Sequence, residues 1–221
     1  MTALLGKEDR KEIERMFRSS LVGEVKVVLF TSKRGCQYCG QTRQLLEEIA
    51  SIDGRVKLHE LDKDEEKAMA EEMAVDMAPT TVVVASNGAR LHYVGMPAGR
   101  QLRSLVEDIA DASRGKAEMD EATRETIRRV AKPTVIKVFV TPVCLYSPLV
   151  VRSAHRFALE NPMIRAMMIE TLEFPEVAKR YDVVGVPRTV INDKVAFDGA
   201  PGERAFAEKV LAASTRAGRA D

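Results

Sequence analysis

The sequence predicts an α/β protein of two similar units, each a central mixed β-sheet flanked by helices. The chain repeats its landmarks at a displacement of 108 residues, because Cys36-Gln37-Tyr38-Cys39 and Ala78-Pro79 return as Cys144-Leu145-Tyr146-Ser147 and Val186-Pro187. Within each repeat, short apolar runs of strand character alternate with stretches of helical period. A length of 221 residues suits two units of about 100 residues, a common domain size.

The first unit is predicted to place a helix before the order β-α-β-α-β-β-α. Residues 25–31 are nearly all apolar or β-branched, as expected for a central strand covered on both faces. Ser86-Asn87-Gly88 lies between two strand-like runs, where an Asn-Gly pair favours a hairpin. The predicted helices cover 7–20, 37–51, 64–74 and 99–112, and the predicted strands cover 25–31, 56–61, 80–85 and 90–94.

The order of elements restarts after Arg114-Gly115-Lys116, a polar stretch whose glycine suits the end of a helix. We therefore assign residues 1–115 to the first unit and residues 116–221 to the second. The second hairpin, around Asn192-Asp193, is predicted to be shorter than the first. The second unit is predicted to have helices at 120–130, 147–160, 175–181 and 203–213 and strands at 134–140, 164–170, 189–191 and 194–197.

The composition is that of an ordinary globular protein, with 45% apolar and 30% charged residues. Lys and Arg number 34 and Asp and Glu number 33, so no overall charge favours nucleic acid or an anionic membrane surface. No apolar run approaches the ~20 residues that span a bilayer, and residues 1–11 lack the apolar core of a signal peptide. We expect a cytoplasmic protein without nucleic-acid or membrane partners.

Cys36 and Cys39 form a Cys-x-x-Cys pair, which in an intracellular protein indicates catalysis or metal binding. A closed zinc site needs four ligands, and the sequence offers no second such pair and no His-x-x-x-His. The histidines at 59, 92 and 155 stand alone. We therefore favour thiol–disulfide exchange and predict no metal and no cofactor.

The two cysteines are predicted to have different roles. A free cysteine has a pKa of about 8.5, and unpaired amides at a helix N-terminus stabilise the thiolate. Cys36 precedes the predicted helix, with Lys33 and Arg34 just upstream, so we predict that Cys36 attacks. Cys39 lies one predicted helical turn deeper, and we expect it to resolve the mixed disulfide.

Pro79 lies 43 residues after Cys36, and Pro187 lies 43 residues after Cys144. We predict that the Ala78–Pro79 bond is cis and that it turns the Ala78 backbone outward. An extended substrate could pair there as an added strand. Tyr38, Ala78 and Pro79 are expected to shape this substrate groove.

Three segments carry a family resemblance: Gly35-Cys36-Gln37-Tyr38-Cys39-Gly40, Ala78-Pro79-Thr80 and Val186-Pro187-Arg188. They resemble the protein disulfide oxidoreductase family, glutaredoxin-like proteins with two fused thioredoxin folds, and the resemblance covers essentially the whole chain. It implies two thioredoxin-like domains and exchange between dithiols and disulfides in intracellular proteins. It further implies a thioredoxin-reductase-like flavoenzyme as the source of electrons.

The chain departs from this family in its second unit, where Ser147 replaces the second cysteine of the expected motif. Cys144 can form a mixed disulfide but has no resolving partner, so dithiol activity is assigned to the first unit only. Cys144 is either a reactive monothiol or a vestige. The degenerate second site around this possible monothiol comprises Tyr146, Ser147, Val186 and Pro187. The N-terminal domain of the bacterial alkyl hydroperoxide reductase flavoprotein is similar, but it carries its intact motif in the second unit.

Two alternatives to a general protein disulfide oxidoreductase remain open. A dedicated electron donor to one partner, such as a peroxiredoxin, would show negligible activity on generic disulfides. A non-catalytic binding scaffold would leave the pKa of Cys36 near 8.5.

Overall fold

The computed structural model describes residues 3–216, which form eight helices and eight strands. The strands are β1 (Val25–Thr31), β2 (Val56–Asp62), β3 (Thr80–Val84), β4 (Arg90–Val94), β5 (Thr134–Val140), β6 (Ile164–Glu170), β7 (Arg188–Ile191) and β8 (Val195–Asp198). The helices are α1 (Lys7–Ser20), α2 (Cys39–Ala50), α3 (Lys67–Glu72), α4 (Arg100–Arg114), α5 (Glu121–Arg128), α6 (Ser147–Glu160), α7 (Pro175–Arg180) and α8 (Glu203–Arg216). None of these helices is long and apolar enough to cross a membrane.

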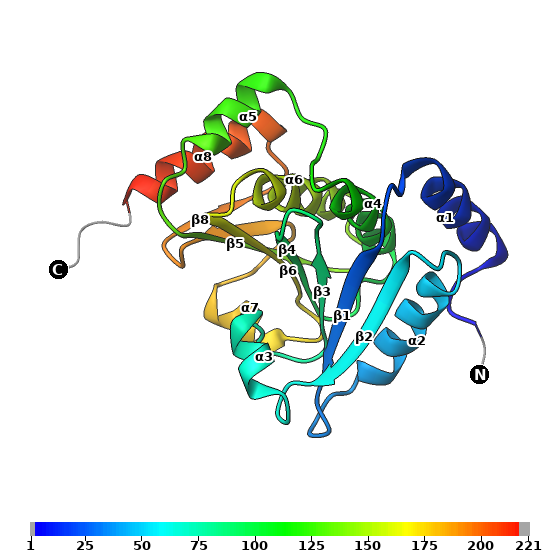
Figure 1. Ribbon diagram of the computed structural model, residues 1–221. Helices are drawn as coiled ribbons and strands as arrows, with labels where there is room; N and C mark the ends of the chain where they lie inside the picture. Colours follow the sequence, from blue (N-terminus) through cyan, green and yellow to red (C-terminus); the bar gives the residue numbers. More distant parts are fainter. Residues whose placement is uncertain (1–2, 217–221) are drawn as a thin grey trace.

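All eight strands belong to one sheet, in the order β2-β1-β3-β4-β6-β5-β7-β8 (Figure 1). The two units join where β4 pairs with β6 in parallel, in a register that runs from Leu91↔Ala166 to Val94↔Ile169. Strand β3 is antiparallel to both β1 and β4, and β6 is parallel to β5. Strands β1 and β5 therefore run in the same direction and end at the same edge of the sheet.

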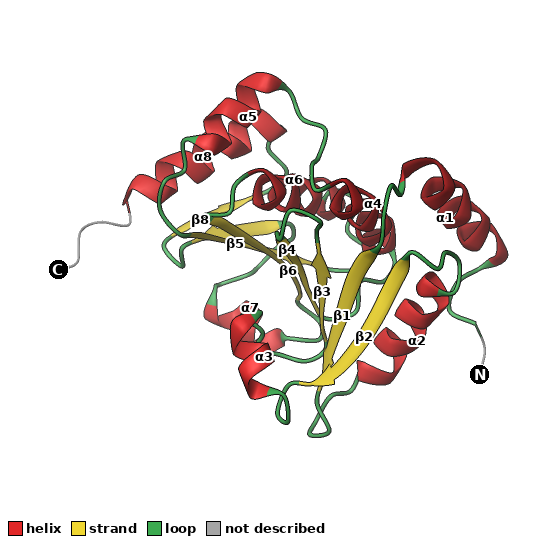
Figure 2. Cartoon of the chain, viewed as in Figure 1, coloured by secondary structure: helices red, strands yellow, loops and turns green. Residues whose placement is uncertain are grey.

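Side-chain alternation along the strands separates the two faces of the sheet. Val27 and Leu29 of β1 pack into the core that lies beneath α1, α2, α4 and α6. Val28 and Phe30 point to the other face, where α3 covers the first unit and α7 covers the second (Figure 2). Helices α2 and α6, which follow the two cysteine motifs, thus lie on the same face.

Most element bounds confirm the sequence predictions, and α1, β1, β4, β5, β6 and α6 match them residue for residue. The helix predicted at 64–74 is shorter and covers only Lys67–Glu72. The Asp62 carboxylate accepts the backbone amides of Asp64 and Glu65 at 2.9 and 3.3 Å. These bonds hold the chain in a turn, so the helix begins later than its charge pattern predicts.

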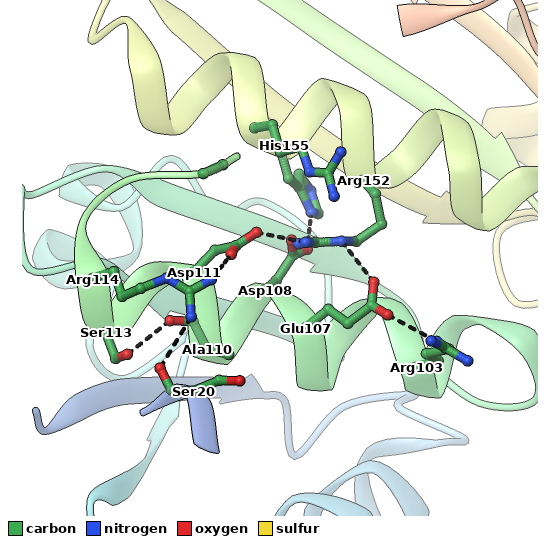
Figure 3. Close-up of polar contacts among 12 residues, drawn as sticks. Ser20, Arg103, Glu107, Asp108, Ala110, Asp111, Ser113, Arg114, Arg152 and His155 are labelled. Carbon is green, nitrogen blue, oxygen red and sulfur yellow. Dashed lines mark hydrogen bonds and ion pairs between the residues drawn. The ribbon is translucent and has the colours of Figure 1, made fainter. Parts of the chain in front are cut away.

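A buried polar cluster joins α4 of the first unit to α6 of the second (Figure 3). Asp108 is fully buried and accepts hydrogen bonds from Arg152, from Tyr93 and from His155 Nδ1, the last at 2.5 Å. Arg152 also pairs with Asp111 at 2.5 Å. One carboxylate therefore connects β4 and α4 of the first unit with α6 of the second.

The protonation states in this cluster follow from its burial. Burial and the neighbouring Arg152 lower the pKa of His155 to about 3, so the imidazole is neutral and donates its Nδ1–H to Asp108. Burial also lowers the pKa of Arg152 to about 10, which leaves the guanidinium charged at neutral pH. Arg152 is thus the positive charge that directly compensates Asp108.

We predict that Asp108→Ala lowers the free energy of unfolding by about 3–5 kcal/mol, because it removes the carboxylate that Arg152, Tyr93 and His155 share and leaves these buried donors short of an acceptor. Glu14→Ala is the control, since it breaks an exposed pair with Arg18 worth less than about 1 kcal/mol. Urea unfolding followed by circular dichroism measures both. An equal loss in the two variants would contradict the structural role of Asp108.

Candidate active site

Cys36 lies in the loop between β1 and α2 and Cys39 begins α2, and their sulfurs are joined in a disulfide with the Cα atoms 5.5 Å apart. Cys39 is the first residue of α2 and is only 6% exposed. Cys36 is more accessible and belongs to the loop before the helix. An incoming sulfur therefore has access to Cys36 before Cys39.

Helix α2 begins two residues later than predicted, which corrects the expectation that Cys39 lies one turn inside it. Tyr38 is the N-cap residue, and its carbonyl accepts the Thr42 amide at 2.9 Å. Gly35 has a left-handed φ of 68°, which turns the chain just before Cys36, and helical geometry starts only at Cys39, the last residue of the motif. Cys39 is the first helical residue and Cys36 comes two residues before the N-cap, so both cysteines belong to the end of α2 at which the backbone amides are unpaired.

The positive charge predicted upstream of Cys36 is partly neutralised. Lys33 forms an ion pair with Glu65, and this interaction raises the pKa of the Lys33 ammonium. The Lys33 amide donates to the Asp62 carboxylate at 3.1 Å. Arg34 is exposed. The helix N-terminus is therefore the more direct source of positive potential at the two sulfurs.

The Ala78–Pro79 bond is cis, as predicted. Thr80, the first residue of β3, pairs with Phe30 of β1. Pro79 therefore lies at the same end of the sheet as the loop that carries Cys36. The Pro79 carbonyl accepts the Gly95 amide at 2.8 Å, which joins this loop to the end of β4.

The second unit reproduces this arrangement without a second motif cysteine. The Cys144 thiol donates to the Val186 carbonyl at 3.4 Å, and the Val186–Pro187 bond is also cis. Ser147 is the first residue of α6, as Cys39 is of α2, and its hydroxyl is fully buried without a hydrogen-bond partner. Tyr146 is the exposed N-cap residue. The predicted residues of the degenerate site thus lie together.

Residues 95–100, here called the bridging loop, connect the two sites. The Met96 amide donates to Glu173 Oε1 at 2.7 Å, and the Arg100 amide donates to the Pro142 carbonyl at 2.8 Å. Gly95 and Gly99 both have positive φ, and a Cβ at Gly99 would lie 2.5 Å from the Pro142 oxygen. The bridging loop therefore donates a hydrogen bond to Pro79 of the first unit and also contacts the loop before Cys144.

Glu173 is the residue at this end of the sheet that sequence reasoning missed. Burial, reinforced by the neighbouring Glu170, raises the pKa of its carboxyl to about 7, although the Met96 amide lowers it. Glu173 Oε2 is buried without a partner. The residue 108 positions earlier in the sequence is Glu65, which is exposed. The residue type alone therefore did not indicate that Glu173 is buried.

The structure places the three histidines apart from the cysteines. His59 is exposed, His92 is buried against the Met73 carbonyl at 2.8 Å, and His155 belongs to the Asp108 cluster. Among residues 3–216 no group of three or more His, Cys, Asp or Glu side chains could hold a metal ion.

We predict that Gly99→Ala lowers the free energy of unfolding by about 1–3 kcal/mol, because the added methyl group meets the Pro142 carbonyl and the left-handed φ strains alanine. Gly54→Ala is the matched control, since nothing lies within 4 Å of its added Cβ. It should stay within about 0.5 kcal/mol of wild type. Equal stability of both variants in urea would contradict the close approach of the bridging loop to Pro142.

We also predict that Glu173→Gln removes a pH dependence of stability. Between the unfolded pKa of 4.5 and the folded pKa of about 7, the folded state keeps a proton that the unfolded chain has lost. Wild type should therefore lose stability relative to the Gln variant as pH rises through this window, and the difference should level off above it. Urea midpoints between pH 4 and pH 8.5 measure it, and a pH-independent difference would refute the assignment.

Two family models match the chain, one described as "Thioredoxin-like domain" over residues 18–110 and one as "Thioredoxin domain" over residues 134–212. The thioredoxin of Methanocaldococcus jannaschii is 34% identical over 76 residues, which cover 34% of this chain and 89% of that protein. An alkyl hydroperoxide reductase polypeptide of Pseudomonas aeruginosa is 22% identical over 120 residues. That match covers 54% of this chain but only 23% of the Pseudomonas protein.

Solved structures extend the likeness over nearly the whole chain. A protein disulfide oxidoreductase from Aeropyrum pernix matches with a TM-score of 0.88 and 28% identity, covering 96% of this chain and 94% of that one. An N-terminal domain of the Enterococcus faecalis alkyl hydroperoxide reductase has the same fold, with a TM-score of 0.86 at 23% identity and coverage of 93% and 99%. The chain belongs to the thioredoxin family, with two thioredoxin-like units in tandem, and with its Cys36–Cys39 pair it is a thiol–disulfide oxidoreductase.

Proposed function

We propose that the substrates are protein disulfides and that Cys36 and Cys39 act in sequence. The Cys36 thiolate attacks one sulfur of the client disulfide, a Cys36–client disulfide forms, and the second client sulfur leaves as a thiolate. The Cys39 thiolate then attacks the Cys36 sulfur and releases the first client sulfur. The client gains two electrons, and Cys36 and Cys39 become a disulfide.

The observation that carries this proposal is the unequal accessibility of two sulfurs that are close enough to bond. Cys36 is partly exposed, whereas Cys39 is buried at the start of α2. A buried thiol has little access to a client protein but immediate access to its neighbour. This difference supports attack by Cys36 and resolution by Cys39.

The substrate groove of this proposal comprises Tyr38, Ala78 and Pro79. Within residues 3–216 the amide and carbonyl of Ala78 make no backbone hydrogen bond, so they are available to an extended client strand. A client held there would run beside the loop of Cys36. Pairing through the main chain suits an enzyme that acts on many client sequences.

The division of labour in the proposal follows the two units. Residues 1–115 form the catalytic unit, and residues 116–221 form a degenerate unit that supports it through the bridging loop and the Asp108 cluster. Cys144, without a resolving thiol, is not needed for the dithiol cycle. The setting is cytoplasmic, since three cysteines, two of them only two residues apart, do not make the disulfide framework of a secreted protein.

The source of electrons in this proposal is a thioredoxin-reductase-like flavoenzyme. The likeness to the Pseudomonas aeruginosa alkyl hydroperoxide reductase also supports a second candidate function, electron donation to one dedicated partner such as a peroxiredoxin. The two candidates differ in breadth, because a general oxidoreductase reduces generic protein disulfides and a dedicated donor reduces its partner alone.

We predict that wild type and Cys144→Ser accelerate dithiothreitol-driven insulin reduction, whereas Cys36→Ser and Cys39→Ser fall to the rate of dithiothreitol alone. Insulin turbidity measures all four proteins side by side. An inert wild type that rapidly reduces a peroxiredoxin would favour the dedicated donor. Loss of activity in Cys144→Ser would contradict the assignment of the cycle to the first unit.

A further inference from the structure

Exposed apolar side chains gather around Cys144. Residues 3–216 expose nine large hydrophobic side chains, and six of them surround the degenerate site, with exposed fractions from 61% for Leu145 to 93% for Val184. These six, here called the apolar patch, are Val143, Leu145, Tyr146, Leu149, Leu172 and Val184. Such a concentration marks an interaction surface, whereas exposed apolar residues scattered singly do not.

The fold brings the apolar patch together from three segments: residues 143–149, which include the first turn of α6, the loop after β6 and the loop before β7. Strands β5 and β6 are parallel neighbours, so the segments that follow them lie at the same edge of the sheet. The Thr171 amide donates to the Val140 carbonyl at 3.0 Å, which ties these two segments together. The Cys144 thiol reaches the Val186 carbonyl and adds the loop that contains Val184.

The first unit shows that the thioredoxin fold does not require apolar residues at these positions. Five patch residues correspond to polar or small residues 108 positions earlier, in the first unit. Val143, Leu145, Leu149, Leu172 and Val184 correspond to Gly35, Gln37, Gln41, Asp64 and Asp76. Only Tyr146 matches its own type, in Tyr38. The second site has thus lost a thiol and carries an apolar surface where the catalytic site is polar.

Open backbone groups identify an extended chain as the occupant. Within residues 3–216 the Val186 amide makes no hydrogen bond, and its carbonyl accepts only the Cys144 thiol. A polypeptide in strand conformation pairs with such groups and directs alternate side chains into the surrounding surface. Ser147, whose buried hydroxyl has no hydrogen-bond partner, begins the helix that follows Cys144.

The patch is also continuous with the interface between the units. Val143 follows Pro142, which accepts the Arg100 amide, and Leu172 precedes Glu173, which accepts the Met96 amide. Strands β3 and β7 are four steps apart in the sheet, a distance of about 19 Å at about 4.8 Å per step. About six extended residues of a client cover that distance.

We propose that the second unit docks an extended apolar segment of a client polypeptide, without a covalent bond, and so delivers a nearby client disulfide to Cys36. The inference rests on the proposed function and adds the class of client: unfolded or partly folded chains with apolar residues beside the disulfide. The first unit supplies the chemistry, and the second supplies affinity.

The test compares two synthetic disulfide-bonded peptides, one carrying a Leu/Val-rich segment about six residues from the disulfide and one carrying a Ser/Gln segment there. The patch variant combines Leu145→Gln, Leu149→Gln and Val184→Asp, which installs the residues of the first unit. The control variant changes three exposed apolar residues elsewhere, through Leu4→Gln, Val22→Asp and Met163→Gln. Circular dichroism verifies that both variants are folded.

Wild type and the control variant should show a KM for the apolar peptide at least about tenfold below that for the polar peptide, which corresponds to about 1.4 kcal/mol. The patch variant should lose this advantage through KM with kcat retained. Equal KM values for the two peptides in wild type, or an unaltered advantage in the patch variant, would overturn the proposal.

Direct binding separates this proposal from the catalytic one. A fluorescent apolar peptide with serine in place of cysteine should bind Cys36→Ser and wild type equally, and it should bind the patch variant at least about tenfold more weakly. Binding without any peptide reduction would refute the catalytic function but not docking. Reduction without binding would refute docking. A dimer that the patch variant abolishes in analytical ultracentrifugation would reassign the patch to self-association.

Discussion

The parallel pairing of β4 with β6 is the constraint on which the rest of the structure depends. Each unit alone would expose one of these strands at an edge, and an unpaired edge favours unwanted association. Their pairing removes both edges and makes one sheet of eight strands. It also sets β1 and β5 in the same direction, so the Cys36 and Cys144 loops lie at one edge and beside helices on one face.

Two further contacts hold the units in this arrangement, one in the helical layer and one at the edge of the sheet. Asp108 satisfies Arg152 and His155 only when α4 and α6 are in register, because a buried charge without its partner is costly. The bridging loop approaches Pro142 so closely that residue 99 has no room for a side chain. The two sites are therefore neighbours with a defined separation.

Much of this architecture could be predicted from the sequence, because it depends on local patterns or on comparison of the two halves. The apolar period located the helices and strands, and the cis bond before Pro79 followed from its spacing to Cys36. The remaining features depend on contacts between distant segments. Each unit has a complete pattern of helices and strands in its own sequence, so nothing there predicts the pairing of β4 with β6. Asp108 and Glu173 have the residue type of ordinary surface carboxylates, and their burial depends on the packing of the two units against each other. Helix α2 starts late because the chain turns at Gly35. The periodicity of apolar residues does not predict such a turn.

The two sites of this thioredoxin-family protein have diverged from one template. One retains the dithiol in a polar setting, and the other pairs a single thiol with an apolar surface. Trapping tests the central claim most directly: Cys39→Ser is mixed with a disulfide-containing unfolded protein, and mass spectrometry locates the mixed disulfide. We expect an adduct at Cys36, and an adduct confined to Cys144 would contradict the assignment of the chemistry to the first unit.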